Sequence, residues 1–397
     1  MEPDLSFLPE IREELDTILQ WWATRMADDE YGGFYGRIDG KGILHPQADK
    51  GAVLNARILW TFSAAARLTG NTAYKAVADR AYQYFSRHFT DPQEGGVFWM
   101  LNHLGEPLHT KKQIYAQAFA IYALSEYFLL TGAPQALQSA LEVFWLVERY
   151  SRDPRQGGYF EAFSRDWQPL GDLRLSEKDA NAAKTMNTHL HVLEAFTNLY
   201  RAFPNDAVKA PLHNLVECFL DKFIDPETHH LRLFFDKNWN LQPGPTSFGH
   251  DIECSWLLVE AAEALGDKNL LQKTSHTALA MAEATLLEGL DTDGALFNEK
   301  KADGCLDTDK HWWPQAEAVV GFYHAWQRSG DKKFLDASFG CWGFIKRFLK
   351  DPEAGEWHWR TDRTGVPILS EDKAGPWKCP YHNGRMAMEV IRRTHTP

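Results

Sequence analysis

Cysteine is scarce and scattered in this sequence. The five cysteines are odd in number and widely separated, which gives neither a disulfide framework nor the close pairs of a zinc site. They are Cys218, Cys254, Cys305, Cys341 and Cys379. This small number of scattered cysteines favours a reducing compartment, and we expect a cytoplasmic protein.

Long hydrophobic runs and excess positive charge are also missing. No charge-free apolar run approaches the roughly 20 residues that a membrane-spanning helix needs. The first residues, Met1-Glu2-Pro3-Asp4, do not resemble a secretory signal. Lys and Arg total 42 against 54 Asp and Glu, a formal net charge of −12. Because Lys and Arg drive most nucleic-acid binding, we expect neither a membrane nor a nucleic-acid partner.

Three common chemical motifs are absent. No Gly-x-Gly-x-x-Gly follows a strand, no Gly-Lys-Ser/Thr loop occurs and no Gly-x-Ser-x-Gly elbow occurs. The sequence therefore supports no nucleotide cofactor and no serine nucleophile.

What the sequence has is apolar and aromatic content. Hydrophobic residues make up 44% of the 397 residues, aromatic residues 13%, and tryptophan occurs 15 times. The chain can bury a large core. Most tryptophans serve as core in any protein, but their number suggests a carbohydrate site, since aromatic faces pack well against sugar C–H groups.

Internal repeats organise the chain. A turn followed by an aromatic, strand-like segment recurs at 28–35, 91–99 and 153–160, with weaker copies at 225–231, 291–297 and 351–357. Markers placed on the aspartates of these turns are 62, 62, 72, 66 and 60 residues apart; they are Asp29, Asp91, Asp153, Asp225, Asp291 and Asp351. Two stretches of helical period lie between markers, as at 50–68 and 71–89, with breaks such as Gly70 and Gly132. The pattern predicts six repeats and twelve helices.

Paired helices can stack into an open solenoid or close into a ring. The first helix of each repeat has polar or aromatic groups near its start that a core would not favour: Arg57; Tyr115 and Gln117; Asn187 and His191; His250 and Glu253; Trp313 and Glu317; His382. Closing the ring would bring all six starts to one cavity. We therefore predict an all-α, (α/α)6 barrel in a single domain, residues 1–397, with the strand-like loops at one mouth.

The start of the fourth of these helices places a base beside a carboxylate. His250 and Glu253 are three residues apart and Trp256 follows three further on, so all three project from one helical face. A histidine held by a carboxylate is an acid/base candidate, and the alternative is a satisfied histidine at a helix start. His191 and His382 occupy similar positions in other repeats, which favours catalysis. A helix N-terminus would help to keep such histidines neutral.

Other candidates follow from helical geometry. His189 should point away from Asn187 and His191, and the other inner helices lack the carboxylates of a di-iron site, so we expect no metal. Arg57 lies in an apolar run and should face the cavity to donate to a ligand, with an internal ion pair as the alternative. Trp313 and Trp377 are candidate sugar platforms, whereas Trp312 should point into packing.

Four segments resemble one family. They are 184–191 with 194–198, 248–258, 312–318 and 375–385, and they are similar to the cellobiose 2-epimerase family within the N-acylglucosamine 2-epimerase superfamily. The resemblance implies an (α/α)6 barrel that needs no metal or nucleotide and inverts C2 of the reducing-end sugar of β-1,4-linked disaccharides. It implies that His250 and His382 form an acid/base pair and that His191 assists ring opening. It also implies that Glu253 and Glu317 orient the histidines, that Arg57, Tyr115 and Asn187 bind O1 and O2, and that Trp313 and Trp377 hold the sugar rings.

Other functions stay open at this point. The same residues would serve a mannose or glucose 2-epimerase, or an aldose–ketose isomerase acting on free monosaccharides. A glycoside hydrolase and a non-catalytic helical binding protein are more distant alternatives. The expected partner is a small sugar substrate, and the oligomeric state is open with a monomer favoured.

Overall fold

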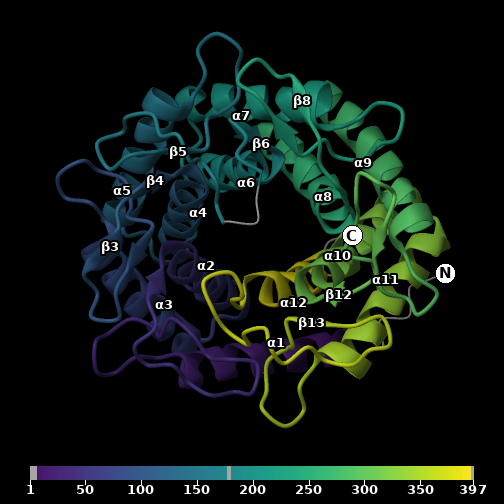
Figure 1. Cartoon of the computed structure of the whole chain (residues 1–397), viewed down its shortest axis with the longest axis horizontal. Coiled ribbons are helices and arrows are strands. Elements are labelled where there is room, and N and C mark those ends of the chain that lie inside the picture. Colours follow the sequence, from purple (N-terminus) through teal and green to yellow (C-terminus); the bar gives the residue numbers. More distant parts are fainter. Residues whose placement is uncertain (1–6, 177–179, 395–397) are drawn as a thin grey trace.

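Two concentric rings of helices build the protein. The computed structural model describes residues 7–176 and 180–394. The inner ring consists of α2 (Ala52–Thr69), α4 (Ile114–Thr131), α6 (Met186–Ala202), α8 (Phe248–Leu265), α10 (Trp312–Ser329) and α12 (Tyr381–Thr394). The outer ring consists of α1 (Leu8–Arg25), α3 (Thr72–Tyr84), α5 (Pro134–Leu146), α7 (Asp206–Cys218), α9 (Lys268–Gly289) and α11 (Lys332–Phe344) (Figure 1). The predicted barrel of helix pairs is confirmed.

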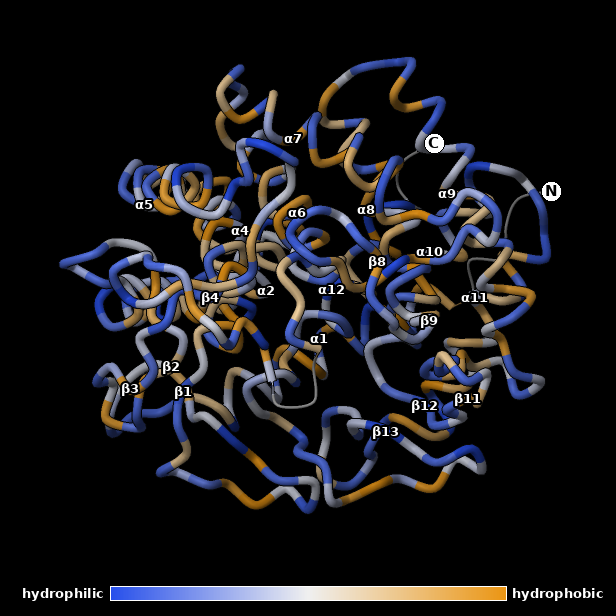
Figure 2. Tube along the Cα trace, turned by 45° about the horizontal axis from the view of Figure 1, so that its top comes forward, coloured by the Kyte–Doolittle hydropathy of each residue, from blue (hydrophilic) through white to orange (hydrophobic). Residues whose placement is uncertain are grey.

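The two rings differ in how apolar their helices are. In α4 every residue from Ile114 to Tyr127 is buried, because this helix packs on the outer ring, on two inner neighbours and on the barrel centre. In α3 only Ala78, Ala81 and Tyr84 are buried, and the remaining face meets solvent. Figure 2 shows the same contrast, with hydrophilic outlying loops around more apolar helices. This is the pattern expected of a buried ring enclosed by an amphipathic one.

Glycine ends four of the inner helices as the sequence predicts. Gly70, Gly132, Gly266 and Gly330 adopt left-handed backbone conformations, and their N–H groups donate to the last turn. Four outer helices end differently, each continuing into a π-helical turn: η1 (Phe85–Phe89), η2 (Val147–Ser151), η3 (Phe219–Phe223) and η4 (Ile345–Leu349).

The ring is closed by the two ends of the chain. In the described part of the chain, α12 is the one helix after the sixth marker, and its outer partner is α1, which precedes the first marker. The indole N–H groups of Trp22 and Trp357 donate to Glu356 and Glu14 across this junction. The sixth helix pair, α1 with α12, therefore combines the two ends of the chain, and each of these helices packs against the other.

The strand-like segments form small antiparallel sheets at the mouth where the inner helices begin. Residues just before an inner helix pair with the hairpin of the next repeat. The sheets are β1 (Lys50–Gly51) with β2 (Met100–Leu101) and β3 (Pro107–His109); β4 (Lys112–Gln113) with β5 (Ala162–Phe163); β6 (Lys184–Thr185) with β7 (Phe234–Phe235) and β8 (Leu241–Gln242); β9 (Thr246–Ser247) with β10 (Glu299–Lys300) and β11 (Leu306–Asp307); and β12 (Lys310–His311) with β13 (Arg360–Thr361). A bridge between Ile38 and Ala374 completes the circle. These loops surround the mouth as predicted.

A buried lysine fixes the turn in five repeats. The lysine Nζ donates to the turn aspartate over 2.6 to 3.0 Å in Lys50–Asp28, Lys112–Asp91, Lys184–Asp153, Lys310–Asp291 and Lys373–Asp351. The marker of the first repeat is thus Asp28, and the choice of Asp29 is wrong, since Asp29 is exposed and pairs with Arg80. In the fourth repeat Asp225 pairs with Arg232 instead.

Within the described part of the chain, no helix combines the length and apolar character that crossing a membrane would require.

Candidate active site

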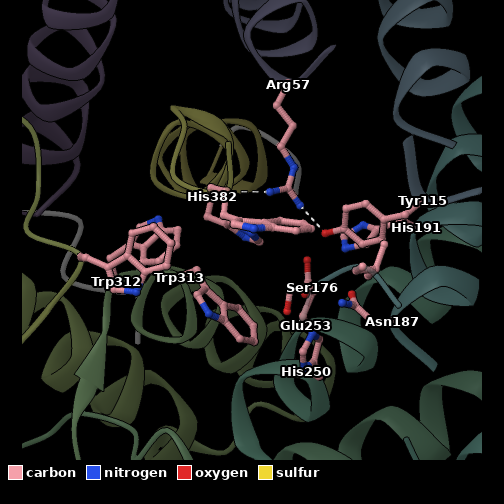
Figure 3. Close-up of a pocket in the computed structure, with 13 residues that line it drawn as sticks. Arg57, Tyr115, Ser176, Asn187, His191, His250, Glu253, Trp312, Trp313 and His382 are labelled. Atoms are coloured by element: carbon pink, nitrogen blue, oxygen red, sulfur yellow. Dashed lines mark hydrogen bonds between the residues drawn. The ribbon is translucent and has the colours of Figure 1, made fainter. Parts of the chain in front are cut away.

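One cavity opens where the first turns of the inner helices converge. It has a volume of about 240 Å³. Side chains from all six inner helices reach it, together with loop residues (Figure 3). The lining residues are Arg57, Tyr115, Leu175, Ser176, Asn187, His191, His250, Glu253, Trp312, Trp313, Trp359, Trp377 and His382.

Nine of the ten predicted site residues line this cavity. The exception is Glu317, which lies behind His382 and accepts a hydrogen bond from its Nδ1 over 2.7 Å. The carboxylate fixes the tautomer of His382 so that Nε2 is left to act on a ligand. Burial holds the pKa of His382 well below its usual value, and Arg57 and Arg385 lower it further against the opposing effect of Glu253. His382 is therefore a neutral base at pH 7.

His250 has a different partner from the one expected. Its Nδ1 lies 2.7 Å from the hydroxyl of Ser247, the residue before α8. Glu253 instead accepts a hydrogen bond from Arg385, so the expectation that Glu253 orients His250 is wrong. Helical spacing brings the two side chains to one face, but the guanidinium across the ring competes for the carboxylate. Desolvation lowers the pKa of His250 to about 4, which also leaves it neutral.

His191 is held by a carboxylate that sequence reasoning missed. Its Nδ1 lies 3.1 Å from Glu194, on the next turn of α6. Glu194 also accepts hydrogen bonds from Tyr381 and Arg385. Burial alone would raise the pKa of Glu194, but Arg385 and His191 lower it to about 2, so this carboxylate is ionised. Burial lowers the pKa of His191.

Arg385 joins the carboxylates around the cavity floor. It is fully buried and donates to Glu194, Glu253 and Glu317. The sequence could have identified Arg385. It lies three residues after His382 in a buried helix, and a buried guanidinium needs a partner, which is the argument that identified Arg57.

The same carboxylates also raise the question of a metal. Ligand atoms of Glu253, Glu317 and His382 lie within 4.8 Å of one another. The Arg385 guanidinium donates to both of these carboxylates, over 2.6 Å in the case of Glu317. The positive charge that a metal would bring to this group is therefore already supplied by the chain.

Arg57 lines the cavity with part of its hydrogen-bonding capacity unused. Its Nη2 donates to the hydroxyl of Tyr115 over 2.8 Å, and Nη1 lies 3.5 Å from the carbonyl of Trp377. Among the described residues, neither Arg57 Nε nor the side-chain oxygen of Asn187 has a hydrogen-bond partner. The alternative of an internal ion pair finds no support in the described part of the chain, where Arg57 has no carboxylate partner. Arg57 and Asn187 both line the cavity, and these two buried polar atoms are left without a hydrogen bond to any residue that the structure describes.

Aromatic rings form much of the wall. The ring of Trp313 lies 4.6 Å from that of His250 and 5.6 Å from that of His382. The prediction that Trp312 points away is wrong: it lines the cavity and packs on Trp359 at 4.6 Å. The cavity is wide enough at the first turn of α10 to meet two consecutive side chains. Trp359, from the hairpin of the sixth repeat, had no helical position from which to be predicted.

Four polar residues of the inner helices serve the fold and do not line this cavity. Gln117, His189, Asp251 and Gln315 each accept a backbone N–H from a hairpin over 2.8 Å. The prediction that His189 faces away from the site is confirmed. Gln117, which stood out as a polar residue at a helix start, anchors Val97.

Comparison with known proteins gives concordant findings. The sequence profile of the family N-acylglucosamine 2-epimerase (GlcNAc 2-epimerase) matches residues 33–384. The chain is 52% identical over 384 residues to a cellobiose 2-epimerase of Bacteroides fragilis, covering 96% of this chain and 98% of that protein. It is 41% identical over 388 residues to a cellobiose 2-epimerase of Ruminococcus albus, covering 97% and 98%. The structure of a cellobiose 2-epimerase from Bacillus thermoamylovorans superposes with a TM-score of 0.94 at 39% identity, covering 98% of this chain and 99% of that one.

Proposed function

Because the chain belongs to the N-acylglucosamine 2-epimerase family and is a sugar 2-epimerase, an enzyme of the isomerase class, we propose that it inverts C2 of the reducing-end glucose of cellobiose. The relatives named above support this choice of substrate, since they are cellobiose 2-epimerases. Related β-1,4-linked disaccharides would react in the same way.

The observation that carries the proposal is the pair His250 and His382 on one cavity. Each has Nδ1 bonded to a neighbour, Ser247 or Glu317, so that Nε2 is free for a substrate. Both are neutral near pH 7 because desolvation lowers their pKa. Two such bases can exchange a proton on opposite faces of one carbon.

The chemistry begins with opening of the sugar ring. The C2 proton of an aldose becomes acidic only when C1 is an aldehyde. His191 would assist this step by moving protons at O1 and O5. The free donors of Arg57 and Tyr115 would then stabilise the cis-enediolate that forms when the C2 proton leaves. Asn187 would bind the neighbouring oxygen.

One histidine must carry a proton while the other accepts one. The enediolate forming beside His382 would raise its proton affinity, and Glu317 would support the imidazolium. His250, beside a serine hydroxyl only, would act as the neutral base for one epimer. In the reverse direction the two histidines exchange roles.

Hydrolysis of a glycosidic bond fits the site less well. It usually needs two carboxylates on either side of the bond. Here Glu194, Glu253 and Glu317 are all bonded to Arg385. No pair of them is left to flank a substrate.

The setting of the enzyme belongs to the same proposal. All five cysteines are free, which suits the cytoplasm. We propose a monomer, because the six inner helices close the ring around the cavity within one chain.

The test is incubation with cellobiose and, separately, with mannose in D2O, followed by NMR. Cellobiose should give glucosyl-mannose with deuterium at C2. Deuterium in the mannose products alone would shift the substrate to free monosaccharides. Release of glucose from cellobiose without exchange would contradict epimerisation and favour hydrolysis.

A further inference from the structure

We propose that Gly249 is a positioning residue. Because it has no side chain, Trp313 can pack directly against α8, and Trp313 then sets the spacing between His250 and His382. This spacing decides whether the proton returns to C2 or to C1. The inference rests on the proposed pair of histidines.

Backbone freedom does not explain a glycine at position 249. Gly249 is the second residue of α8, is buried and has an ordinary helical backbone without a positive φ. Glycine at such a position weakens a helix relative to alanine. The small size of glycine, rather than its backbone freedom, must therefore explain its presence here.

Close approach of Trp313 supplies the reason. A Cβ at position 249 would lie 2.6 Å from Cη2 and 2.7 Å from Cζ3 of the Trp313 ring, and 2.9 Å from Cβ of Pro314. These distances are well below van der Waals contact. The six-membered part of the indole thus occupies the space that any larger residue would fill.

In this position against α8, Trp313 contacts both His250 and His382. Its ring centroid lies 4.6 Å from that of His250, with 52° between the planes, and 5.6 Å from that of His382, with 42° between the planes (Figure 3). Both distances are in the range of direct ring contact. The indole is a rigid plate with two side-chain torsions, so it holds the two imidazoles at a fixed separation.

The separation matters because the enediolate can be protonated at two adjacent carbons. A proton delivered to C2 from the opposite face gives the epimer. A proton delivered to C1 gives the ketose, with no other reactant consumed in either case. If the ring of Trp313 moves, the histidine that delivers the proton moves relative to these carbons.

The direct test is Gly249→Ala with Gly343→Ala as the matched control. Gly343 lies in outer helix α11, and nothing lies within 4 Å of the Cβ that alanine would add there. Both substitutions replace a helical glycine by alanine. We expect G343A to keep the wild-type kcat and product ratio. G249A should lose on the order of tenfold or more in kcat at a similar KM, because small misplacements of reacting groups are costly, and its share of ketose should rise.

A second background keeps the test informative if G249A folds poorly. Trp313→Phe removes the six-membered part of the indole that meets the added Cβ. Adding G249A should therefore cost less, in kcat or in Tm, in the W313F protein than in the wild type. Equal costs in both backgrounds, or failure of both to fold, would overturn the proposal.

Two results separate this inference from the proposed function. Wild-type kcat and product ratio in G249A would overturn the role of Gly249 and leave the histidine pair standing. Full activity in His250→Asn or His382→Asn would overturn the histidine pair itself.

Discussion

The two ends of the six inner helices carry opposite chemistry. At the N-terminal end burial lowers the pKa of three histidines, and Arg57 lines the cavity without a carboxylate partner among the described residues. At the C-terminal end arginines stand in the last turn of four inner helices: Arg67, Arg201, Arg328, and Arg392 with Arg393. They pair with Glu126, Glu260, Glu263 and Glu389.

Burial lowers the pKa of the three histidines, and helix dipoles favour the same difference between the two ends of the ring. Six N-termini give the active-site end a positive potential, which disfavours imidazolium and favours an anionic intermediate. Six C-termini give the far end a negative potential, which arginine complements. Under the proposed function, one ring of parallel helices has a catalytic end and a stabilising end, so substitutions at the two ends should have different consequences.

The largest effect should come from the histidines of the catalytic end. His382→Asn and His250→Asn should each lower kcat for epimerisation by roughly 10³-fold, since each removes one of two general acid/base groups. Steady-state kinetics with cellobiose should show this loss of kcat. Thermal unfolding should show little change in Tm. A loss below tenfold in either variant would remove that histidine from the mechanism.

A smaller effect is expected from the carboxylate behind His382. Glu317→Gln removes the negative charge that supports the imidazolium, so the pKa of His382 should fall further and kcat should drop on the order of 10²-fold. Because the proposed mechanism requires a protonated His382 during the cycle, the alkaline limb of kcat should move to lower pH. The pH profile measures this, with KM as the control. An unmoved alkaline limb would contradict the role given to Glu317.

The smallest effect should come from the far end. Arg201, in the last turn of α6, donates to Glu260 over 2.9 Å. Arg201→Lys keeps the charge that complements the dipole, so kcat should stay within about twofold of wild type and Tm should fall only slightly. A large loss of kcat in R201K would show that the two ends are not independent.

Much of the barrel and the composition of its cavity could be predicted from the sequence. The repeating turns and the glycine stops at Gly70 and Gly132 indicate helix pairs, and helical position alone places side chains such as Arg57 and Asn187 on the inner face. These features depend on local periodicity and backbone conformation, which a sequence displays directly. The pairing of α1 with α12 depends on ring closure and is not local.

The contacts that join site residues of different helices could not be predicted for the same reason. Glu253 and His250 share a helical face, yet Glu253 bonds Arg385 across the ring and His250 bonds Ser247. Glu194 and His191 lie on one helix, but the ionised state of Glu194 depends on Arg385. Spacing shows which side chains can meet within one helix, whereas the choice of Arg385 as the partner of Glu253 depends on how the ring closes.

The most direct test of the two-histidine account is solvent exchange at C2 in the single variants. With cellobiose or glucosyl-mannose in D2O, each variant keeps one base and should exchange the C2 proton of only one epimer, without forming the other. H382N and H250N should select opposite epimers. If either variant still interconverts the epimers at a rate near wild type, or if both exchange the same epimer, the account is wrong.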